Sequence, residues 1–191
     1  MTLLGLELVT DWIEIAGFAA AAIGLGISAD QIRQAAQKAT EERKAALLQA
    51  ERDLEWRQTV EAQSAIRRFL DDRLAQDAMM MIDWDGRSFS IDGKNVVVSR
   101  KKTAAALSVG RSEFTNVEAF IRDRMDAFFN HFELMQQAID SKIYPMEYIK
   151  FPIDYYVNRM KNEFGLDIFY SYLKNFGFQK AGALLKSISE R

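Results

Sequence analysis

The longest uncharged stretch of the chain lies near its N-terminus. From Ile15 to Ala29 there is no charged side chain, and Ser28 supplies the one hydroxyl. A helix from Trp12 to Ala29 would be about 27 Å long, close to the roughly 30 Å hydrocarbon core of a bilayer. The pattern predicts a transmembrane helix within residues 1–29. The alternatives are a buried helix of a soluble domain and a signal peptide, although a signal peptide would need a basic start that this chain lacks.

Charge and residue size around this stretch predict its orientation and its partner. No Lys or Arg precedes the stretch, whereas basic residues from Arg33 onward follow it. The positive-inside rule then places the N-terminus outside and the rest of the chain in the cytoplasm. In a bacterium, this arrangement is that of a single-pass protein of the inner membrane. Small residues four apart let helices pack closely in lipid, and an acidic residue at the membrane edge can either reach the interface or line a pore. The candidate residues for oligomerisation or a pore are Glu14, Gly17, Ala21, Gly24 and Gly26.

A long charged and alanine-rich segment follows the apolar stretch. No Gly or Pro occurs between Gly26 and Gly86, so residues 30–80 are expected to form one or two long helices. Residues 30–55 are predicted to be a stalk helix, either simply solvated or self-associating. From Trp56 the apolar side chains become larger, and residues 56–191 are predicted to form a cytoplasmic helical domain. The stalk positions with 4-3-4-3 spacing are Ile32, Ala36, Ala39, Arg43, Ala46 and Ala50.

The region near residues 88–98 has the pattern of a β-hairpin. Two β-prone runs, Ser88–Ile91 and Val96–Val98, flank Asp92-Gly93, the turn dipeptide that most strongly indicates a two-residue hairpin loop. The basic triplet Arg100-Lys101-Lys102 follows. It is interpreted as a solvated face, with contact to lipid or RNA phosphates as the alternative.

The rest of the chain has helical periodicity. Thr115 and Glu118 form a capping-box sequence that opens a helix with an apolar face reaching Ile139. Pro145 and Pro152 each suit the first turn of a further helix. Residues 164–176, ended by Gly177, and residues 178–188 are expected to be the last helices. The predicted fold class is all-α: a transmembrane helix, a stalk helix and a helical bundle with one small hairpin.

Composition narrows the chemistry that this chain can perform. The net charge of −2 gives no overall attraction to nucleic acid, and the lack of cysteine excludes thiolate chemistry. With one histidine, His131, a multi-histidine metal site is excluded, and no phosphate-binding glycine loop is present. No cofactor is expected. The aromatic residues between Tyr144 and Tyr156 are interpreted as core packing or a subunit contact in preference to a nucleotide-stacking platform.

Arg124 and His131 are the candidate catalytic pair. They are seven positions apart on the predicted helix from Asn116, so their side chains point the same way about 10 Å apart along its axis. A histidine can move a proton to or from a ribose hydroxyl, and an arginine can stabilise charge developing on phosphorus. The structural alternatives are a half-buried core histidine and an arginine in a salt bridge at the edge of the apolar face. Asp123 and Asp126 are interpreted as solvated or paired with Arg122.

The Arg-x6-His spacing on a bundle helix resembles the motif of HEPN-type ribonucleases, in which a composite site forms on dimerisation. The chain departs from that motif at Met125, where a polar residue is usual. A membrane helix joined to such a bundle resembles the membrane accessory protein of type VI CRISPR systems. The Asp83-Trp84 element and the aromatic C-terminal half also resemble uncharacterised bacterial single-pass membrane-anchored helical proteins.

These observations lead to three hypotheses about function. The first is a membrane-anchored homo-oligomer that forms a pore or depolarises the membrane in anti-phage immunity, as the CRISPR resemblance implies. The second is a metal-independent, HEPN-like ribonuclease that uses Arg124 and His131. The third is a non-catalytic scaffold or regulatory subunit. The expected partners are further copies of the chain and the lipid bilayer, with RNA or a CRISPR effector protein implied by the resemblance.

Overall fold

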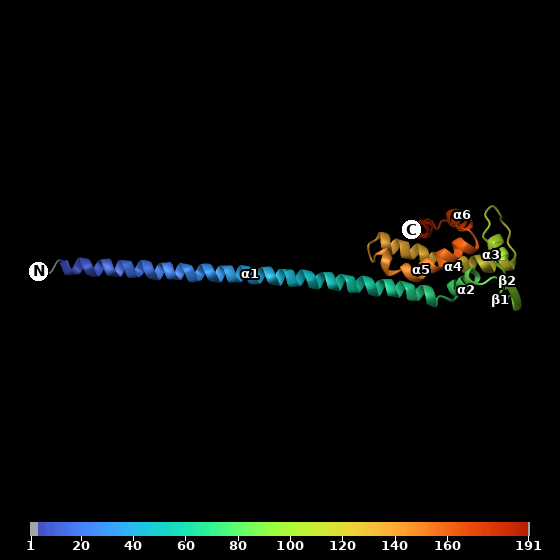
Figure 1. Cartoon of the computed structure of the whole chain (residues 1–191). Coiled ribbons are helices and arrows are strands. Elements are labelled where there is room, and N and C mark those ends of the chain that lie inside the picture. The colour runs from blue at the N-terminus through green and yellow to red at the C-terminus, as the bar shows by residue number, and fades with distance from the viewer. Residues whose placement is uncertain (1–3, 191) are drawn as a thin grey trace. The chain divides into compact units, whose positions relative to one another are not determined.

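The computed structural model describes the backbone of residues 4–190 and the side chains of residues 31–190. This part of the chain is mostly helical, with seven α-helices and one two-stranded antiparallel hairpin (Figure 1). The coarse fold class predicted from the sequence is therefore confirmed. The chain divides into two compact units, Met1–Leu54 and Glu55–Arg191.

The elements of the chain follow one another with short connections. The first helix, α1, is continuous and accounts for a third of the sequence. The elements are α1 (Leu4–Asp71), α2 (Arg73–Asp83), β1 (Arg87–Ile91), β2 (Lys94–Val98), α3 (Arg100–Ala106), α4 (Asn116–Asp140), the 3₁₀ helix η1 (Met146–Tyr148), α5 (Lys150–Glu163), α6 (Leu166–Phe176) and α7 (Gln179–Ser189).

The predicted helical region of residues 30–80 is two helices that meet at Asp72. The backbone of Asp72 is extended (φ −70°, ψ 115°), which ends α1 without any glycine or proline. The carboxylate of Asp72 accepts hydrogen bonds from the main-chain N–H of Leu74 at 2.9 Å and of Ala75 at 3.4 Å. Asp72 is therefore the N-cap of α2, where it satisfies amides that have no partner within the helix.

The hairpin forms as the sequence predicts. Asp92 (φ 50°) and Gly93 (φ 73°) both have positive φ, as a two-residue type I′ loop requires. The register pairs Phe89 with Val96 and Ile91 with Lys94. Phe89 and Ile91 are buried, and the ring of Phe89 packs on Phe120 of α4. This contact gives the small sheet the helical support that an isolated hairpin lacks.

The basic triplet Arg100-Lys101-Lys102 is the first turn of a helix, α3, that the sequence analysis did not predict. The Ser99 hydroxyl caps this helix by accepting from the main-chain N–H of Lys102 at 3.4 Å. Thr103 and Ala106 bury the opposite face of α3. A serine followed by basic residues and three alanines was the sequence signal for a short capped helix.

Helix α4 is the central element of the second unit and packs against α2, α3 and α7. The predicted capping box is present, because Thr115 Oγ1 accepts from the Glu118 N–H and Glu118 Oε2 accepts from the Thr115 N–H. Its buried face carries six large apolar residues, Ile121, Met125, Phe128, Phe129, Phe132 and Met135. The rings of Phe128 and Phe132 lie 4.8 Å apart between centroids, at the centre of an aromatic core.

Helical segments occur where the sequence predicts the last helices, but their lengths and first residues differ from those expected. Pro145 precedes η1, a single 3₁₀ turn, in place of the longer helix expected there. Pro152 lies just inside α5, after Phe151, whose backbone is extended (φ −96°, ψ 124°). Gly177 ends α6 in the left-handed conformation (φ 84°), which glycine adopts without steric cost.

Candidate functional site

Arg124 and His131 both lie on α4, and each has a carboxylate partner on α2 or at its N-cap. His131 Nε2 lies 2.9 Å from Asp72 Oδ2, and Arg124 Nε lies 3.5 Å from Asp77 Oδ2. Both side chains are mostly buried. The two residues that were predicted to act together on a phosphodiester therefore form two separate links between the same pair of helices.

The His131 link is integrated into the capping of α2. Oδ1 of Asp72 accepts from the first amides of the helix, while Oδ2 is left to bond His131. The hydrogen bond from His131 and those from α2 together hold the pKa of Asp72 below its usual value, although partial burial opposes them. The His131 ring also packs edge-on against Phe69, with centroids 5.6 Å apart. The half-buried core histidine considered as the alternative matches this geometry.

Arg124 is held by stacking as well as by charge. Its guanidinium carbon lies 3.4 Å from the centroid of the Phe120 ring, at the distance of a direct cation–π contact. Asp123 adds a longer ion pair of 3.9 Å to Nη1. The predicted salt bridge at the edge of the apolar face is therefore present, with Asp77 as its main partner.

The two residues open onto different hollows. His131 lines a hollow of about 480 Å³ between the end of α1 and the second half of α4, together with Arg68, Leu134 and Tyr144. Arg124 lines a hollow of about 420 Å³ between β1 and the start of α4. Within one chain, neither hollow contains both candidate catalytic residues.

Arg122, which the sequence analysis treated only as an ion-pair partner, is the most enclosed charged residue among residues 31–190. Its guanidinium carbon lies 4.1 Å from the centroid of Phe114 and 4.2 Å from that of Phe176, and Nη1 donates to the main-chain oxygen of Ala106 at 3.0 Å. Phe114 belongs to the segment between α3 and α4, so Arg122 fastens that segment to the core. Its spacing from the buried residues Ile121 and Met125 was the available sequence signal.

Asp126 has a hydrogen-bond partner that the sequence-based interpretation, solvated or paired with Arg122, did not include. It is partly buried and accepts a hydrogen bond from the hydroxyl of Tyr172 on α6 at 2.5 Å. Burial raises the pKa of Asp126, against the opposing effects of the Tyr172 hydroxyl and the charge of Arg122. The partner lies on a helix far along the chain, which the pattern around Asp126 could not reveal.

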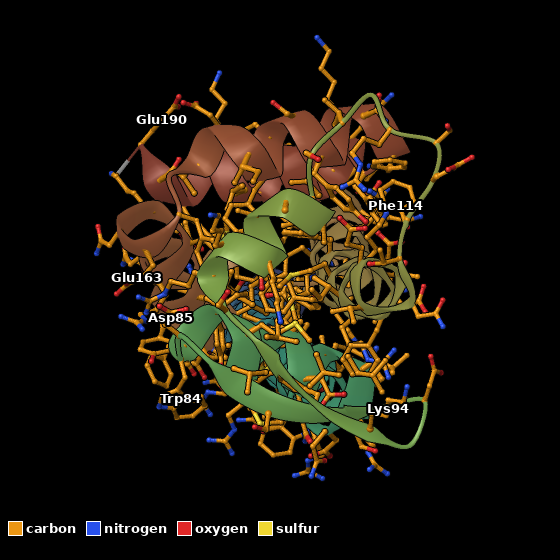
Figure 2. The ribbon with its side chains drawn as sticks, turned by 90° about the vertical axis from the view of Figure 1, so that its right-hand side faces the viewer. Trp84, Asp85, Lys94, Phe114, Glu163 and Glu190 are labelled. Carbon is orange, nitrogen blue, oxygen red and sulfur yellow. The ribbon has the colours of Figure 1, made fainter. Side chains whose placement is uncertain are left out.

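The Asp83-Trp84-Asp85 element joins α2 to the hairpin through a network of charges. Arg159 of α5 donates to the main-chain oxygen of Asp83, and the Tyr155 hydroxyl donates to Asp83 Oδ1 at 2.8 Å. Asp85 Oδ1 accepts from the main-chain N–H of Arg100 at 2.8 Å. Figure 2 shows Trp84 and Asp85 on the same side of the unit as Glu163, whose carboxylate bonds Arg159 and Arg100.

The aromatic stretch between Tyr144 and Tyr156 has mixed roles. Tyr144 is buried, and Tyr156 packs against Phe69 and Phe128. Phe151 and Tyr155 are exposed, so the predicted core packing applies to part of the stretch only.

The predicted oligomerisation and pore residues Glu14, Gly17, Ala21, Gly24 and Gly26 lie within α1, but their side chains are outside the described residues. In the part of the chain whose side chains are described, no helix is long and apolar enough to span a membrane. In that same part, no three acidic or histidine side chains are grouped so that they could hold a metal ion.

No protein-family model, curated protein or solved structure matches this chain. The resemblances to HEPN-type ribonucleases and to the CRISPR membrane accessory protein therefore stay predictions from the sequence.

Proposed function

We propose that the protein is a membrane-anchored homo-oligomer, assembled through α1, that acts by permeabilising the bilayer. The observation that carries this proposal is the exposure of α1 between residues 31 and 54. Every residue of this segment is exposed in a single chain, including Ile32, Leu47, Leu48 and Leu54. Most helices in proteins are stabilised by packing an apolar face against a neighbour more than by their intrinsic propensity. The segment therefore needs a partner.

Several apolar residues of this segment, although not Leu48, fall on one side of the helix. With Leu47 in place of the predicted position Ala46, and with Leu54 added, the stalk positions form a stripe with 4-3-4 spacing that repeats after eleven residues. An eleven-residue repeat keeps one face of a helix in register with a parallel neighbour over a long distance. The α1 stripe consists of Ile32, Ala36, Ala39, Arg43, Leu47, Ala50 and Leu54.

Further copies of the chain are the partner that best fits this stripe. Residues 31–54 carry Lys or Arg at five positions (33, 38, 43, 44 and 52) and Asp or Glu at four (41, 42, 51 and 53), so the difference is one charge. Interleaved charges of both signs let identical helices pack side by side without strong repulsion, whereas they offer little to a strongly charged partner. The alanines of the stripe allow close approach. Self-association would also bring together the small residues predicted to pack in the membrane.

The membrane part of the proposal rests on the sequence before residue 30. The apolar stretch, the following basic residues and the small residues four apart supported a single span that packs on itself. An assembly of such spans with Glu14 at one end has the elements of a pore. Anti-phage defence, the setting implied by the CRISPR resemblance, is the context in which we expect this activity.

Adjacent leucines of α1 provide a matched test of assembly. Leu47 lies on the α1 stripe and Leu48 lies off it, and both are exposed, at 68% and 55%. Leu47→Glu should dissociate the detergent-solubilised protein, measured by light scattering after size exclusion, while Leu48→Glu should leave its mass unchanged. The same pair should differ in dye release from bilayer vesicles. A wild-type protein that is monomeric in detergent, or that leaves such vesicles intact, would refute the proposal.

Arg124 and His131 are not needed as catalysts in this function. Each is paired with a carboxylate, and the links that they make between α2 and α4 account for their burial. The ribonuclease and scaffold hypotheses remain predictions.

A further inference from the structure

The hairpin has two outer edges, and the register determines which main-chain groups face outward. In a two-residue hairpin, the pair next to the loop exchanges hydrogen bonds, and bonded and non-bonded pairs then alternate. Ile91–Lys94 and Phe89–Val96 are thus bonded pairs. Ser88–Val97 and Ser90–Asn95 lie between them as non-bonded pairs. The N–H and C=O groups of Ser88 and Ser90 point outward from β1, and those of Asn95 and Val97 point outward from β2.

One outward acceptor on the edge of β2, the main-chain oxygen of Val97, is occupied by a side chain of the same chain. Lys102, on the first turn of α3, donates from Nζ to the main-chain oxygen of Val97 at 2.7 Å. A lysine over an outward carbonyl occupies the acceptor and places a charge at the edge, which discourages a further strand from pairing there.

The edge of β1 has no such protection. Among residues 31–190, no side chain or main-chain group from outside the hairpin bonds the main chain of Ser88 or Ser90. Both serines are exposed. Beside Ser90 lies the hollow of about 420 Å³, with Asp92 on its sheet side and Asn116 and Asp123 on its α4 side. Asn116, at the start of α4, donates from Nδ2 to Asp92 Oδ2 at 2.7 Å, so α4 meets the sheet just beyond β1 and leaves the hollow beside Ser90. Figure 2 shows the hairpin crossing one face of the unit from Trp84 to its tip at Lys94.

We propose that β1 pairs antiparallel with β1 of a second copy of this chain, forming a four-stranded sheet across a twofold axis. The outward-facing residues make β1 self-complementary. With Phe89 at the centre of the pairing, Ser88 of one copy faces Ser90 of the other, and both members of each pair have outward N–H and C=O groups. The two pairs can exchange about four hydrogen bonds. The outward N–H and C=O groups of Ser88 and Ser90 in both β1 strands then all have partners.

Charge and side-chain size favour this self-pairing. β1 begins with Arg87 and is followed by Asp92, so antiparallel apposition brings the basic end of one strand near the acidic end of the other. The side chains of Ser88 and Ser90 lie on the exposed face of the sheet and are small, so they do not obstruct a neighbouring strand. A second copy therefore meets both the hydrogen-bonding and the charge requirements of this edge.

The pairing of β1 strands rests on the proposed function, because assembly through α1 is what makes the pairing stable. Two short strands joined edge to edge are weakly stable alone, but chains already assembled through α1 meet at a high effective concentration. The pairing would then join the second units of chains that α1 holds together. Association through α1 and pairing through β1 involve different residues, so they can be tested separately.

The absence of cysteine from the chain allows a specific cross-linking test. One chain carries Ser88→Cys and a differently tagged chain carries Ser90→Cys, and the two are co-expressed as full-length proteins. The Cα atoms of a bonded antiparallel pair lie about 5.5 Å apart, within the range that a disulfide spans. The mixed dimer should form under mild oxidation, with much less product from either variant alone. The matched control on the other edge, Asn95→Cys with Val97→Cys, should give no mixed dimer.

Proline variants test whether the outward N–H is responsible. Placing Ser88→Pro in the Ser90→Cys chain removes an outward donor without removing a hydrogen bond of the hairpin, and should lower the mixed product roughly tenfold. Val97→Pro in the same chain alters the directly opposite position and should leave the yield unchanged. Circular dichroism of both variants establishes that the fold is retained.

The outcomes separate this inference from the proposed function. An oligomer of unchanged mass that gives no mixed product overturns the β1 pairing alone. Equal yields on both edges also overturn it, because the pairing is specific to β1. A protein that is monomeric by light scattering but gives the mixed product at high concentration supports the β1 pairing and refutes assembly through α1. A monomer without mixed product refutes both.

Discussion

The carboxylate of Asp72 ends one helix, caps the next and binds His131, which lies 59 positions further along the chain. Asp72 is thus the point at which α1, α2 and α4 are joined. Two acceptor oxygens allow this double role, because Oδ1 serves the amides of α2 and Oδ2 serves the imidazole.

Substitution of Asp72 should separate its capping role from its bond to His131. Asp72→Ala removes both and should lower the free energy of unfolding by about 1–2 kcal/mol. Asp72→Asn keeps a good N-cap and should cost less. Urea unfolding at pH 7 measures both values. Equal losses for the two variants would contradict the double role.

The same carboxylate should make the stability of the protein depend on pH in the acid range. Because the folded-state pKa of Asp72 is lowered, its contribution is present above the usual value of about 3.9 and is lost as the pH falls through the lower, folded pKa. The loss of stability of the wild-type protein below pH 4 should therefore be steeper than that of Asp72→Asn. Parallel acid unfolding curves for the two proteins would show that this carboxylate is not responsible.

Asp126 should have the opposite pH dependence. Its pKa is raised by burial, so the protonated form favours the fold, and this contribution is lost as the pH rises through the folded pKa. Asp126→Asn keeps an acceptor for Tyr172 and removes the buried charge. It should match or exceed the wild-type stability at pH 7, by up to about 1 kcal/mol, and lose this advantage toward pH 4. Thermal unfolding at both pH values measures the difference, and a large loss of stability at pH 7 would be inconsistent with this account.

Removing the Tyr172 hydroxyl should be costly because it leaves Asp126 without its hydrogen-bond donor. Tyr172→Phe is expected to lower the free energy of unfolding by about 1–3 kcal/mol. The control is Tyr170→Phe, whose hydroxyl bonds only Ser189 Oγ, at 3.0 Å near the surface. This control should cost less than about 1 kcal/mol. Similar losses for both variants would mean that burial of Asp126 does not set the cost.

Arg122 should be irreplaceable by lysine, because a planar guanidinium stacks between two rings and an ammonium does not. Arg122→Lys is expected to lower the free energy of unfolding by about 2 kcal/mol and to speed hydrogen exchange of residues 107–115, which Phe114 anchors. The control is Arg87→Lys, because the guanidinium carbon of Arg87 lies 4.9 Å from the centroid of the exposed Trp84 ring. This substitution should change the free energy of unfolding less than Arg122→Lys does. Unchanged exchange in Arg122→Lys would exclude the anchoring role.

The ribonuclease hypothesis predicts a different result from the proposed function. Arg124→Gln and His131→Gln should each weaken a link between α2 and α4 and cost about 1 kcal/mol of stability, while vesicle permeabilisation by the folded variants persists. Cleavage of single-stranded RNA without metal by the wild type, lost in both folded variants, would instead establish the catalytic pair. Circular dichroism provides the folding control.

The sequence by itself determined the helix caps and turns, because each of these depends on the chemistry of one or two residues. Thr115 and Glu118 satisfy the first amides of α4, Asp92-Gly93 supplies the positive φ angles of the loop, and Gly177 adopts the left-handed turn after α6. Each of these depends on neighbours within about four positions, so periodicity and turn chemistry were sufficient.

The tertiary structure decided which polar side chains pair with one another. Asp72 with His131, Asp126 with Tyr172, and Arg122 with Phe114 and Phe176 are contacts between elements. Sequence spacing placed Arg124 and His131 on one helix face, but it could not show that α2 presents a carboxylate to each of them. Those partners follow from how the helices pack, because burial requires each charged or polar group to find a partner wherever the fold provides one.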